Sequence, residues 1–319
     1  MMEIHLKPEK AWFGVHVLLH TNGETDALAG ETARLAGLGV NLLIVEVNYH
    51  FAYATHPELQ MPDPIDRQAA KRLALACRRE GIHLTPQFQC LGHQSWAENT
   101  FPLLARYPEF DETPGQFPGN QGIYCRSWCP QHPQVNGIVF TLMDELLEAF
   151  EADTLHVGMD EVFLIASEHC PRCKGADPAA LFARAVNELY EYLVGECKVA
   201  MMMWGDRLLD DAVMGYGEWE AARNGTHPAI ERIPRDIILC DWHYEPGKSY
   251  PSVPFFQEQG FRVLPAGWRN EQAVAALIDY SRQHQAGRML GYLATTWGAV
   301  KVSELADWGP IRVAAEVLR

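Results

Sequence analysis

The chain has 319 residues, of which 48% are hydrophobic and 21% charged, proportions typical of a globular protein with one large domain or two smaller ones. Its formal net charge of −15, with no local cluster of Lys and Arg, argues against nucleic acid and anionic membranes as partners. No apolar stretch reaches the roughly 18 residues of a membrane span, and residues 1–8 lack the apolar core of a signal peptide, so we expect a cytoplasmic protein.

Short apolar runs alternate with amphipathic helical patterns along the whole chain. Helices are predicted between strands, with a less regular link after the fifth strand. Regular alternation implies right-handed parallel crossovers, and eight such units close into a (β/α)8 TIM barrel, with a doubly wound open sheet as the alternative. The predicted strands are 12–19, 41–47, 82–88, 154–157, 199–204, 237–242, 262–265 and 290–295. The predicted helices are 26–38, 66–80, 133–150, 178–198, 253–259, 270–286 and 307–318.

The chain shows no internal boundary. No Pro-rich or Gly-rich linker divides it, so we predict a single domain over residues 1–319. The extra length lies in three loops, 89–131, 163–177 and 207–235, which follow the third, fourth and fifth predicted strands. Loops at the carboxyl ends of barrel strands surround the active site in barrel enzymes, so these three are expected on the catalytic face.

Polar and aromatic residues gather just after the predicted strands. The fourth strand stops at two adjacent carboxylates, Asp160 and Glu161. Four of the others are tryptophans from the last four strands, and indole rings pack well on the flat C–H faces of sugars. Since no glycine-rich phosphate loop and no tightly spaced metal-ligand cluster follows a strand, a carbohydrate pocket is favoured. The remaining strand-end residues are Glu46, Asn48, Gln89, His93, Trp204, Asp206, Asp241, Trp242, Tyr244, Trp268 and Trp297.

The adjacency of Asp160 and Glu161 limits the chemistry that they can perform. Two carboxyls that cleave a glycosidic bond together usually lie on opposite sides of it, whereas consecutive Cα atoms are only about 3.8 Å apart. A substrate with a 2-acetamido group resolves this conflict, because its own carbonyl oxygen can attack the anomeric carbon. Asp160 would then hold the amide N–H, and Glu161 would be the acid.

The stretch His156-Val-Gly-Met-Asp160-Glu161 resembles the His-x-Gly-Gly-Asp-Glu motif of the family 20 glycoside hydrolases, the β-N-acetylhexosaminidases. Three further segments are similar to motifs of that family. They are Gly92-His93, Met203-Trp204-Gly-Asp206 and Thr296-Trp297-Gly298. The resemblance extends from about residue 41 to 297, and it implies a distant family member that consists of the catalytic (β/α)8 barrel.

The resemblance implies a retaining exo-β-N-acetylhexosaminidase that removes terminal N-acetylglucosamine or N-acetylgalactosamine by substrate-assisted catalysis without a cofactor. Asp160 would orient the acetamido group, Glu161 would be the general acid and base, and Tyr244 would donate a hydrogen bond to the acetamido oxygen. The expected substrate-binding residues are His93, Trp204, Asp206, Asp241, Trp242, Trp268, Trp297 and Glu46.

The chain departs from the family pattern at three places. Met159 replaces the second glycine of the motif, the first strand has no sugar-binding Arg, and no acidic residue follows Trp297. Two alternatives therefore stay open. In one, Asp241 or Glu245 is a covalent nucleophile acting on sugars without an acetamido group. In the other, the barrel binds carbohydrate without cleaving it.

The cysteines give a separate hypothesis. Two pairs, Cys125-x3-Cys129 and Cys170-x2-Cys173, lie in loops rich in Pro and Gly, and the second pair has a spacing suited to zinc. A structural zinc ion bound by Cys125, Cys129, Cys170 and Cys173 is one interpretation. Free or oxidised thiols are the alternative.

Overall fold

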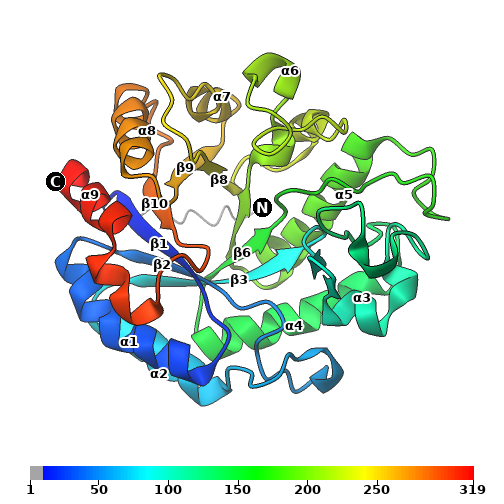
Figure 1. Cartoon of the computed structure of the whole chain (residues 1–319), viewed down its shortest axis with the longest axis horizontal. Coiled ribbons are helices and arrows are strands. Elements are labelled where there is room, and N and C mark those ends of the chain that lie inside the picture. The colour runs from blue at the N-terminus through cyan, green and yellow to red at the C-terminus, as the bar shows by residue number, and fades with distance from the viewer. Residues whose placement is uncertain (1–9) are drawn as a thin grey trace.

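A computed structural model describes residues 10–319, and within them eight parallel strands form a closed barrel surrounded by helices (Figure 1). Strand β1 pairs with β2 on one side and with β10 on the other, so the sheet has no open edge and the doubly wound alternative is wrong. All eight predicted strands are confirmed, with bounds shifted by at most two residues. The barrel strands are β1 (Trp12–Leu18), β2 (Leu42–Glu46), β3 (His83–Cys90), β6 (Thr154–Gly158), β7 (Ala200–Trp204), β8 (Ile238–Trp242), β9 (Arg262–Gly267) and β10 (Gly291–Thr295).

The helices lie on the outside of the barrel (Figure 1). Several begin where a side chain accepts a backbone N–H of the first turn, as Thr21, Asp66 and Asn270 do. The helix predicted over 178–198 is an α-helix only to Tyr190 and continues as a π-helical segment, Glu191–Glu196. The α-helices are α1 (Asn22–Gly37), α2 (Arg67–Arg79), α3 (Pro102–Arg106), α4 (Val135–Phe150), α5 (Pro178–Tyr190), α6 (Asp211–Met214), α7 (Ser252–Glu258), α8 (Glu271–Gln283) and α9 (Gly309–Leu318).

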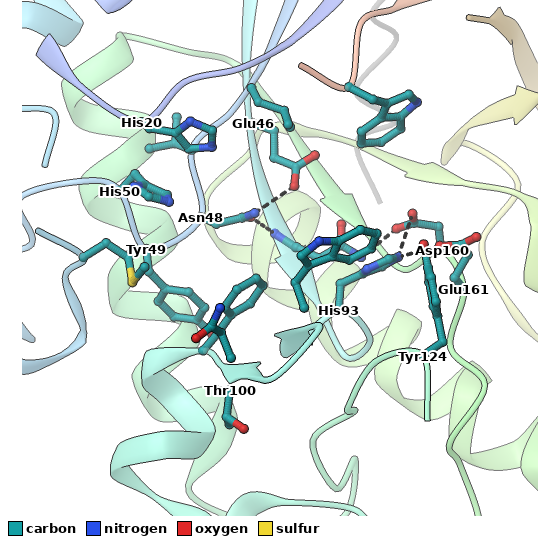
Figure 2. Close-up of a pocket in the computed structure, with 18 of the residues that line it drawn as sticks. His20, Glu46, Asn48, Tyr49, His50, His93, Thr100, Tyr124, Asp160 and Glu161 are labelled. Carbon is teal, nitrogen blue, oxygen red and sulfur yellow. Dashed lines mark hydrogen bonds and ion pairs between the residues drawn. The ribbon is translucent and has the colours of Figure 1, made fainter. Parts of the chain in front are cut away.

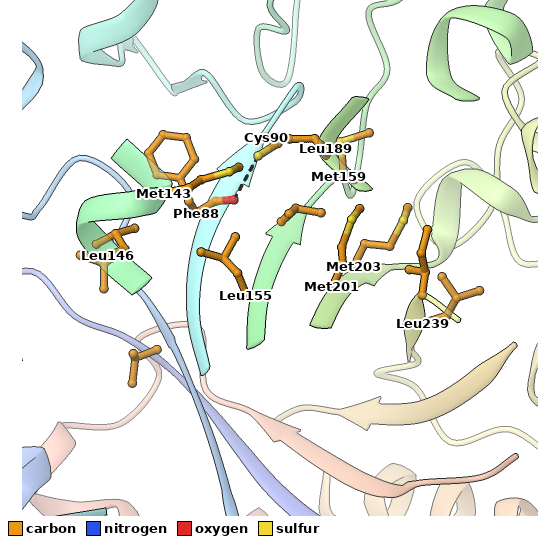
Figure 3. Close-up of a cluster of buried hydrophobic side chains, with 14 of the residues drawn as sticks. Phe88, Cys90, Met143, Leu146, Leu155, Met159, Leu189, Met201, Met203 and Leu239 are labelled. Carbon is orange, nitrogen blue, oxygen red and sulfur yellow. Dashed lines mark hydrogen bonds between the residues drawn. The ribbon is translucent and has the colours of Figure 1, made fainter. Parts of the chain in front are cut away.

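Successive side chains of each strand point to opposite faces, and both faces are buried. In β7, Met202 and Trp204 face the barrel interior, whereas Met201 and Met203 face the helices. Figure 3 shows part of this outer layer, in which Leu155, Met201 and Met143 belong to one buried cluster. Because both faces are apolar, the strands read as continuous hydrophobic runs, and polar residues are concentrated at the strand ends.

The long loops follow the carboxyl ends of the strands, as predicted. The loop after β3 contains a small hairpin of β4 (Ser95–Trp96) and β5 (Asn99–Thr100), followed by α3. The link after β7 contains only short helical turns and α6. None of the helices within residues 10–319 combines the length and apolar character required to cross a bilayer. The segment 1–8, considered above for a signal peptide, lies outside the described residues.

Candidate active site

A cavity of about 780 Å³ opens at the carboxyl ends of the barrel strands. Asp160 and Glu161 lie in its wall, and Figure 2 shows His93 beside both carboxylates. Six further predicted site residues contribute to the lining, and the loops after β1, β2 and β3 complete it. The predicted residues in the lining are Glu46, His93, Asp160, Glu161, Trp242, Tyr244, Trp268 and Trp297.

The turn after β6 places both carboxylates in the cavity. Gly158, Met159 and Glu161 have φ values of 67°, 73° and 49°, all in the left-handed region. Gly158 is required there for a second reason, because a Cβ atom at this position would collide with the side-chain amide of Gln89. Left-handed conformations of non-glycine residues cost free energy and are concentrated at functional sites. The sharp turn therefore brings two consecutive carboxylates to one cavity.

His93 holds the two carboxylates together. Its Nε2 atom lies 3.3 Å from Asp160 Oδ2 and 2.9 Å from Glu161 Oε2. Burial alone would lower the pKa of His93, but the charge of Asp160 and its contacts with both carboxylates leave that pKa well above its ordinary value. Burial would raise the pKa of Asp160, and His93, together with the 2.6 Å hydrogen bond donated by Gln89 Nε2, lowers it. An ionised Asp160 beside a protonated His93 is the state that these interactions favour.

Glu161 is positioned by neighbours on both sides. Its backbone N–H donates to Asp206 Oδ2 at 2.9 Å, and its side chain lies beside the Tyr124 hydroxyl, close enough to interact with it. Asp206 was expected to contact substrate, but it is buried under this turn and forms an ion pair with Arg207 at 2.7 Å. Burial, opposed by Arg207, raises the pKa of Asp206 to about 6. Asp206 supports the site from below and does not line the cavity.

Aromatic side chains form the wall opposite the loop after β3. Tyr244 stacks on Trp242 with ring centroids 4.8 Å apart, and its hydroxyl accepts a hydrogen bond from Trp297 Nε1 at 2.7 Å. Trp268 contacts Tyr244 at 5.4 Å. These four rings provide the apolar surface expected for a sugar. Trp204 is the exception, because it is fully buried beneath Trp297 and does not reach the cavity.

Asp241 was expected in the pocket and lies elsewhere. Because Trp242 points into the barrel, the preceding residue of β8 points outward toward α7. Asp241 accepts a hydrogen bond from Ser252 Oγ at 2.7 Å and lies 3.2 Å from His243 Nε2. The other ring nitrogen of His243 lies 2.6 Å from Glu220. Burial alone would lower the pKa of His243, but Asp241 and Glu220 raise it to about 9.

This buried cluster predicts a pH dependence of stability. A histidine whose pKa is raised on folding stabilises the protein fully below its unfolded pKa, and this contribution is lost as the pH rises through about 9. The shift corresponds to about 3 kcal/mol in the free energy of unfolding. We expect the melting temperature of the wild type to fall between about pH 7 and pH 10 more steeply than that of His243→Gln. The matched control is His169→Gln, at an exposed loop position. Parallel curves for His243→Gln and the wild type would refute the prediction.

The side of the cavity formed by β1 and β2 has a polar network. Glu46 lies 3.2 Å from His16 Nε2 and accepts hydrogen bonds from Gln87 at 2.8 Å and from Asn48 at 2.7 Å. His16 lies on the first strand, where the sequence lacks the family's Arg, and its side chain is fully buried. Glu46 is therefore held in place with its carboxylate toward the cavity (Figure 2).

Several lining residues carried no predictive signal in the sequence. They lie in loops, where neither the helical nor the strand period applies. Tyr124 is the most informative of them, because its ring contacts His93 as well as Glu161. An aromatic residue in a long loop after a strand is the one signal that could have identified it. The residues of this group are His20, Tyr49, His50, Met61, Trp96, Asn99, Thr100, Phe101 and Tyr124.

The loop cysteines do not form the predicted set of four. Cys129, Cys170 and Cys173 lie together, and their fourth neighbour is Glu112. Cys125 lies instead beside the active site, with its sulfur 3.6 Å from the backbone oxygen of Glu161. Cysteine spacing along the sequence does not show the direction in which each side chain points, so it could not separate Cys125 from Cys129.

Known proteins resemble this chain in sequence and in fold. A β-hexosaminidase of Akkermansia muciniphila is 28% identical over 110 residues, which are 34% of this chain and 22% of the relative. The Flavobacterium johnsoniae chitobiase has a TM-score of 0.68 at 17% identity and is matched over 98% of this chain and 48% of its own. The β-N-acetylhexosaminidase of Bacteroides fragilis has a TM-score of 0.67 at 15% identity and is matched over 97% of this chain and 66% of its own.

The chain thus spans about a fifth of the first relative and about half of the second. The structural matches, at this level of identity, show that the barrel fold is shared. The model of the catalytic domain of glycosyl hydrolase family 20 matches residues 66–301, about three quarters of the chain. From this match over most of the barrel we conclude that the chain belongs to glycosyl hydrolase family 20.

Proposed function

We propose that the protein is a retaining exo-β-N-acetylhexosaminidase that acts by substrate assistance on terminal N-acetylglucosamine or N-acetylgalactosamine. The observation that carries the proposal is the placement of Asp160 and Glu161. Both line one cavity, His93 bridges them, and an aromatic wall faces them. The named activities of the similar proteins, β-hexosaminidase and chitobiase, support the same class of reaction.

In the proposed first step, the ionised Asp160 accepts a hydrogen bond from the acetamido N–H of the sugar. The acetamido carbonyl oxygen attacks the anomeric carbon while Glu161 protonates the departing glycosidic oxygen, and the bond to the leaving group breaks. The resulting oxazolinium is positively charged, and the carboxylate of Asp160 stabilises it. A paired, low-pKa carboxylate suits this role because it remains charged.

In the second step, Glu161 removes a proton from a water molecule that attacks the anomeric carbon from the face that the leaving group left. The bond between this carbon and the acetamido oxygen breaks, which restores the acetamido group. Each step inverts the configuration of the anomeric carbon, so the product retains the configuration of the substrate. Tyr124 and His93 hold the Glu161 carboxylate during both steps, since each contacts it. Tyr244 lies within the aromatic wall, where its hydroxyl would donate to the acetamido oxygen. This chemistry requires no cofactor.

The two-carboxylate alternative finds little support in the geometry. Its proposed nucleophile Asp241 is buried against His243 and Ser252, and neither Asp241 nor Glu245 is among the residues that line the cavity. The non-catalytic alternative has no such conflict, so activity measurements must separate it from the proposed hydrolase.

Hydrolysis of a panel of 4-nitrophenyl glycosides tests the proposal. We expect turnover of the N-acetyl-β-glucosaminide or N-acetyl-β-galactosaminide, at least about 100-fold slower turnover of the plain β-glucoside, and inhibition by a thiazoline that mimics the oxazolinium. Equal turnover of sugars with and without the acetamido group would favour the two-carboxylate enzyme. Binding of N-acetylglucosamine without hydrolysis of any glycoside would favour the non-catalytic barrel.

A further inference from the structure

Outside the active site, one group of side chains has the composition of a metal site. Glu112, Cys129, Cys170 and Cys173 are buried, and their nearest ligand atoms all lie within 4.8 Å of one another. We propose that these four residues bind a structural zinc ion that joins the loop after β3 to the loop after β6.

The distances fit a tetrahedral ion. With Zn–S bonds near 2.3 Å, tetrahedral geometry places the ligand atoms about 3.8 Å apart. The sulfur of Cys129 lies 3.4 Å from that of Cys173 and 3.4 Å from that of Cys170. Small side-chain adjustments would bring these atoms to the spacing that zinc requires. Three thiolates and one carboxylate carry the same total charge as the four thiolates of common structural sites.

The carboxylate of Glu112 gives the independent observation. Its side chain is fully buried, Oε1 accepts a hydrogen bond from the backbone of Ser167 at 2.9 Å, and Oε2 has no hydrogen-bond partner in the described part of the chain. No Lys, Arg or His side chain within residues 10–319 forms an ion pair with it. A buried charge without a partner is costly, and a cation among the thiolates would satisfy it.

The backbone around the cysteines also fits metal-bound thiolates. The turn that carries Cys170 and Cys173 is closed by backbone hydrogen bonds, from the N–H of Cys170 to the oxygen of Ser167 at 3.0 Å and from the N–H of Lys174 to the oxygen of Cys170 at 3.2 Å. These bonds fix the backbone of the turn and so orient the two side chains. The Cys170-x2-Cys173 turn is therefore shaped to present two sulfur atoms to one point.

A disulfide explains the cluster less well than zinc does. Any disulfide uses two of the three thiols and leaves the buried Glu112 carboxylate without a counter-charge among residues 10–319. A soft, tetrahedral thiolate-rich set with one carboxylate suits zinc, whereas calcium and magnesium prefer oxygen ligands. Binding would release the three thiol protons, with no change in oxidation state.

The position of the cluster assigns the ion a structural role. Glu112 and Cys129 flank the segment that carries Tyr124, and Cys170 and Cys173 follow Glu161 in the next loop. The ion would therefore brace two walls of the active site without touching the cavity. The inference stands independently of the proposed function, because metal binding can be measured without any substrate.

The first test measures metal in the purified protein. We expect about one equivalent of zinc per chain by inductively coupled plasma mass spectrometry. Replacement by cobalt is expected to give the intense visible and charge-transfer bands of a tetrahedral cobalt thiolate. Protein that, fully reduced, binds neither zinc nor cobalt, or that carries iron in place of zinc, would overturn the assignment.

The second test identifies the ligands. Cys129→Ser is expected to lose zinc and Glu112→Gln to bind it at least about tenfold more weakly. Cys125→Ser and Glu109→Gln, matched substitutions in the same loop, should retain it. Loss of zinc from Cys125→Ser to the same extent as from Cys129→Ser would refute the proposed set. If a ligand variant fails to fold, chelation of zinc from the wild type still locates the site, because the loops that the ion joins lose their support. Hydrogen exchange should then accelerate in segments 111–131 and 161–177, and unchanged exchange would contradict a bracing role.

Discussion

Replacement of Glu161 by Gln is expected to lower kcat for 4-nitrophenyl N-acetyl-β-glucosaminide by about 100- to 10,000-fold, the usual contribution of a general acid and base. The amide retains the size of the side chain but cannot transfer the proton to the leaving oxygen or accept one from water. KM and the inhibition constant of the thiazoline should change little, because Asp160 and the aromatic wall remain in place. Steady-state kinetics and inhibition measurements check both expectations.

The matched control is Glu168→Gln, in the same loop. Glu168 is exposed and, among residues 10–319, forms an ion pair only with Lys174, at 3.1 Å, so its replacement should leave kcat unchanged. An aryl glycoside with a more basic leaving group should lose more activity in Glu161→Gln, because it depends more on protonation. A Glu161→Gln enzyme with full activity on both substrates would remove Glu161 from the mechanism.

Replacement of Asp160 by Asn is expected to lower kcat by about 100- to 1,000-fold, the range measured when one electrostatic contact to a transition state is removed. The amide cannot stabilise the positive oxazolinium, and it also removes one of the two carboxylates that contact the protonated His93. Unlike Glu161→Gln, this variant should bind the thiazoline more weakly by a similar factor. The two neighbouring carboxylates are therefore distinguished by the inhibitor.

Asp153→Asn is the matched control for this variant. Asp153 lies just before β6, at the opposite end of that strand, and its side chain is exposed. It should leave both kcat and thiazoline affinity unchanged. If Asp160→Asn kept the affinity for the thiazoline while losing activity, Asp160 would act on a step other than amide orientation, and substrate assistance would lose its main support.

The strands could be predicted because each is a short apolar run, and their residues are buried on both faces. The pair Asp160 and Glu161 could be predicted to face a cavity because it interrupts such a run at a carboxyl end. The sequence also contained the information needed to predict whether a strand residue points into or out of the barrel. Asp241 precedes the inward-facing Trp242, and the two-residue period by itself sends Asp241 outward toward Ser252.

The depth at which a side chain lies below the cavity, and the contacts made by loop residues, could not be predicted in the same way. Trp204 points inward as expected but is covered by Trp297, and Asp206 turns beneath Glu161 toward Arg207. Tyr124 reaches Glu161 from a loop that has no period to specify its direction.

The sequence by itself determined the barrel, its strand ends and the adjacent carboxylates, because burial periodicity and chain connectivity are local properties. Only the tertiary structure decided which side chains meet across loops. It placed His93 beside both carboxylates. It also showed that Glu112, and not the predicted Cys125, is the fourth member of the cluster with Cys129, Cys170 and Cys173. These contacts join residues far apart in the chain, and their geometry depends on how the loops pack over the closed barrel.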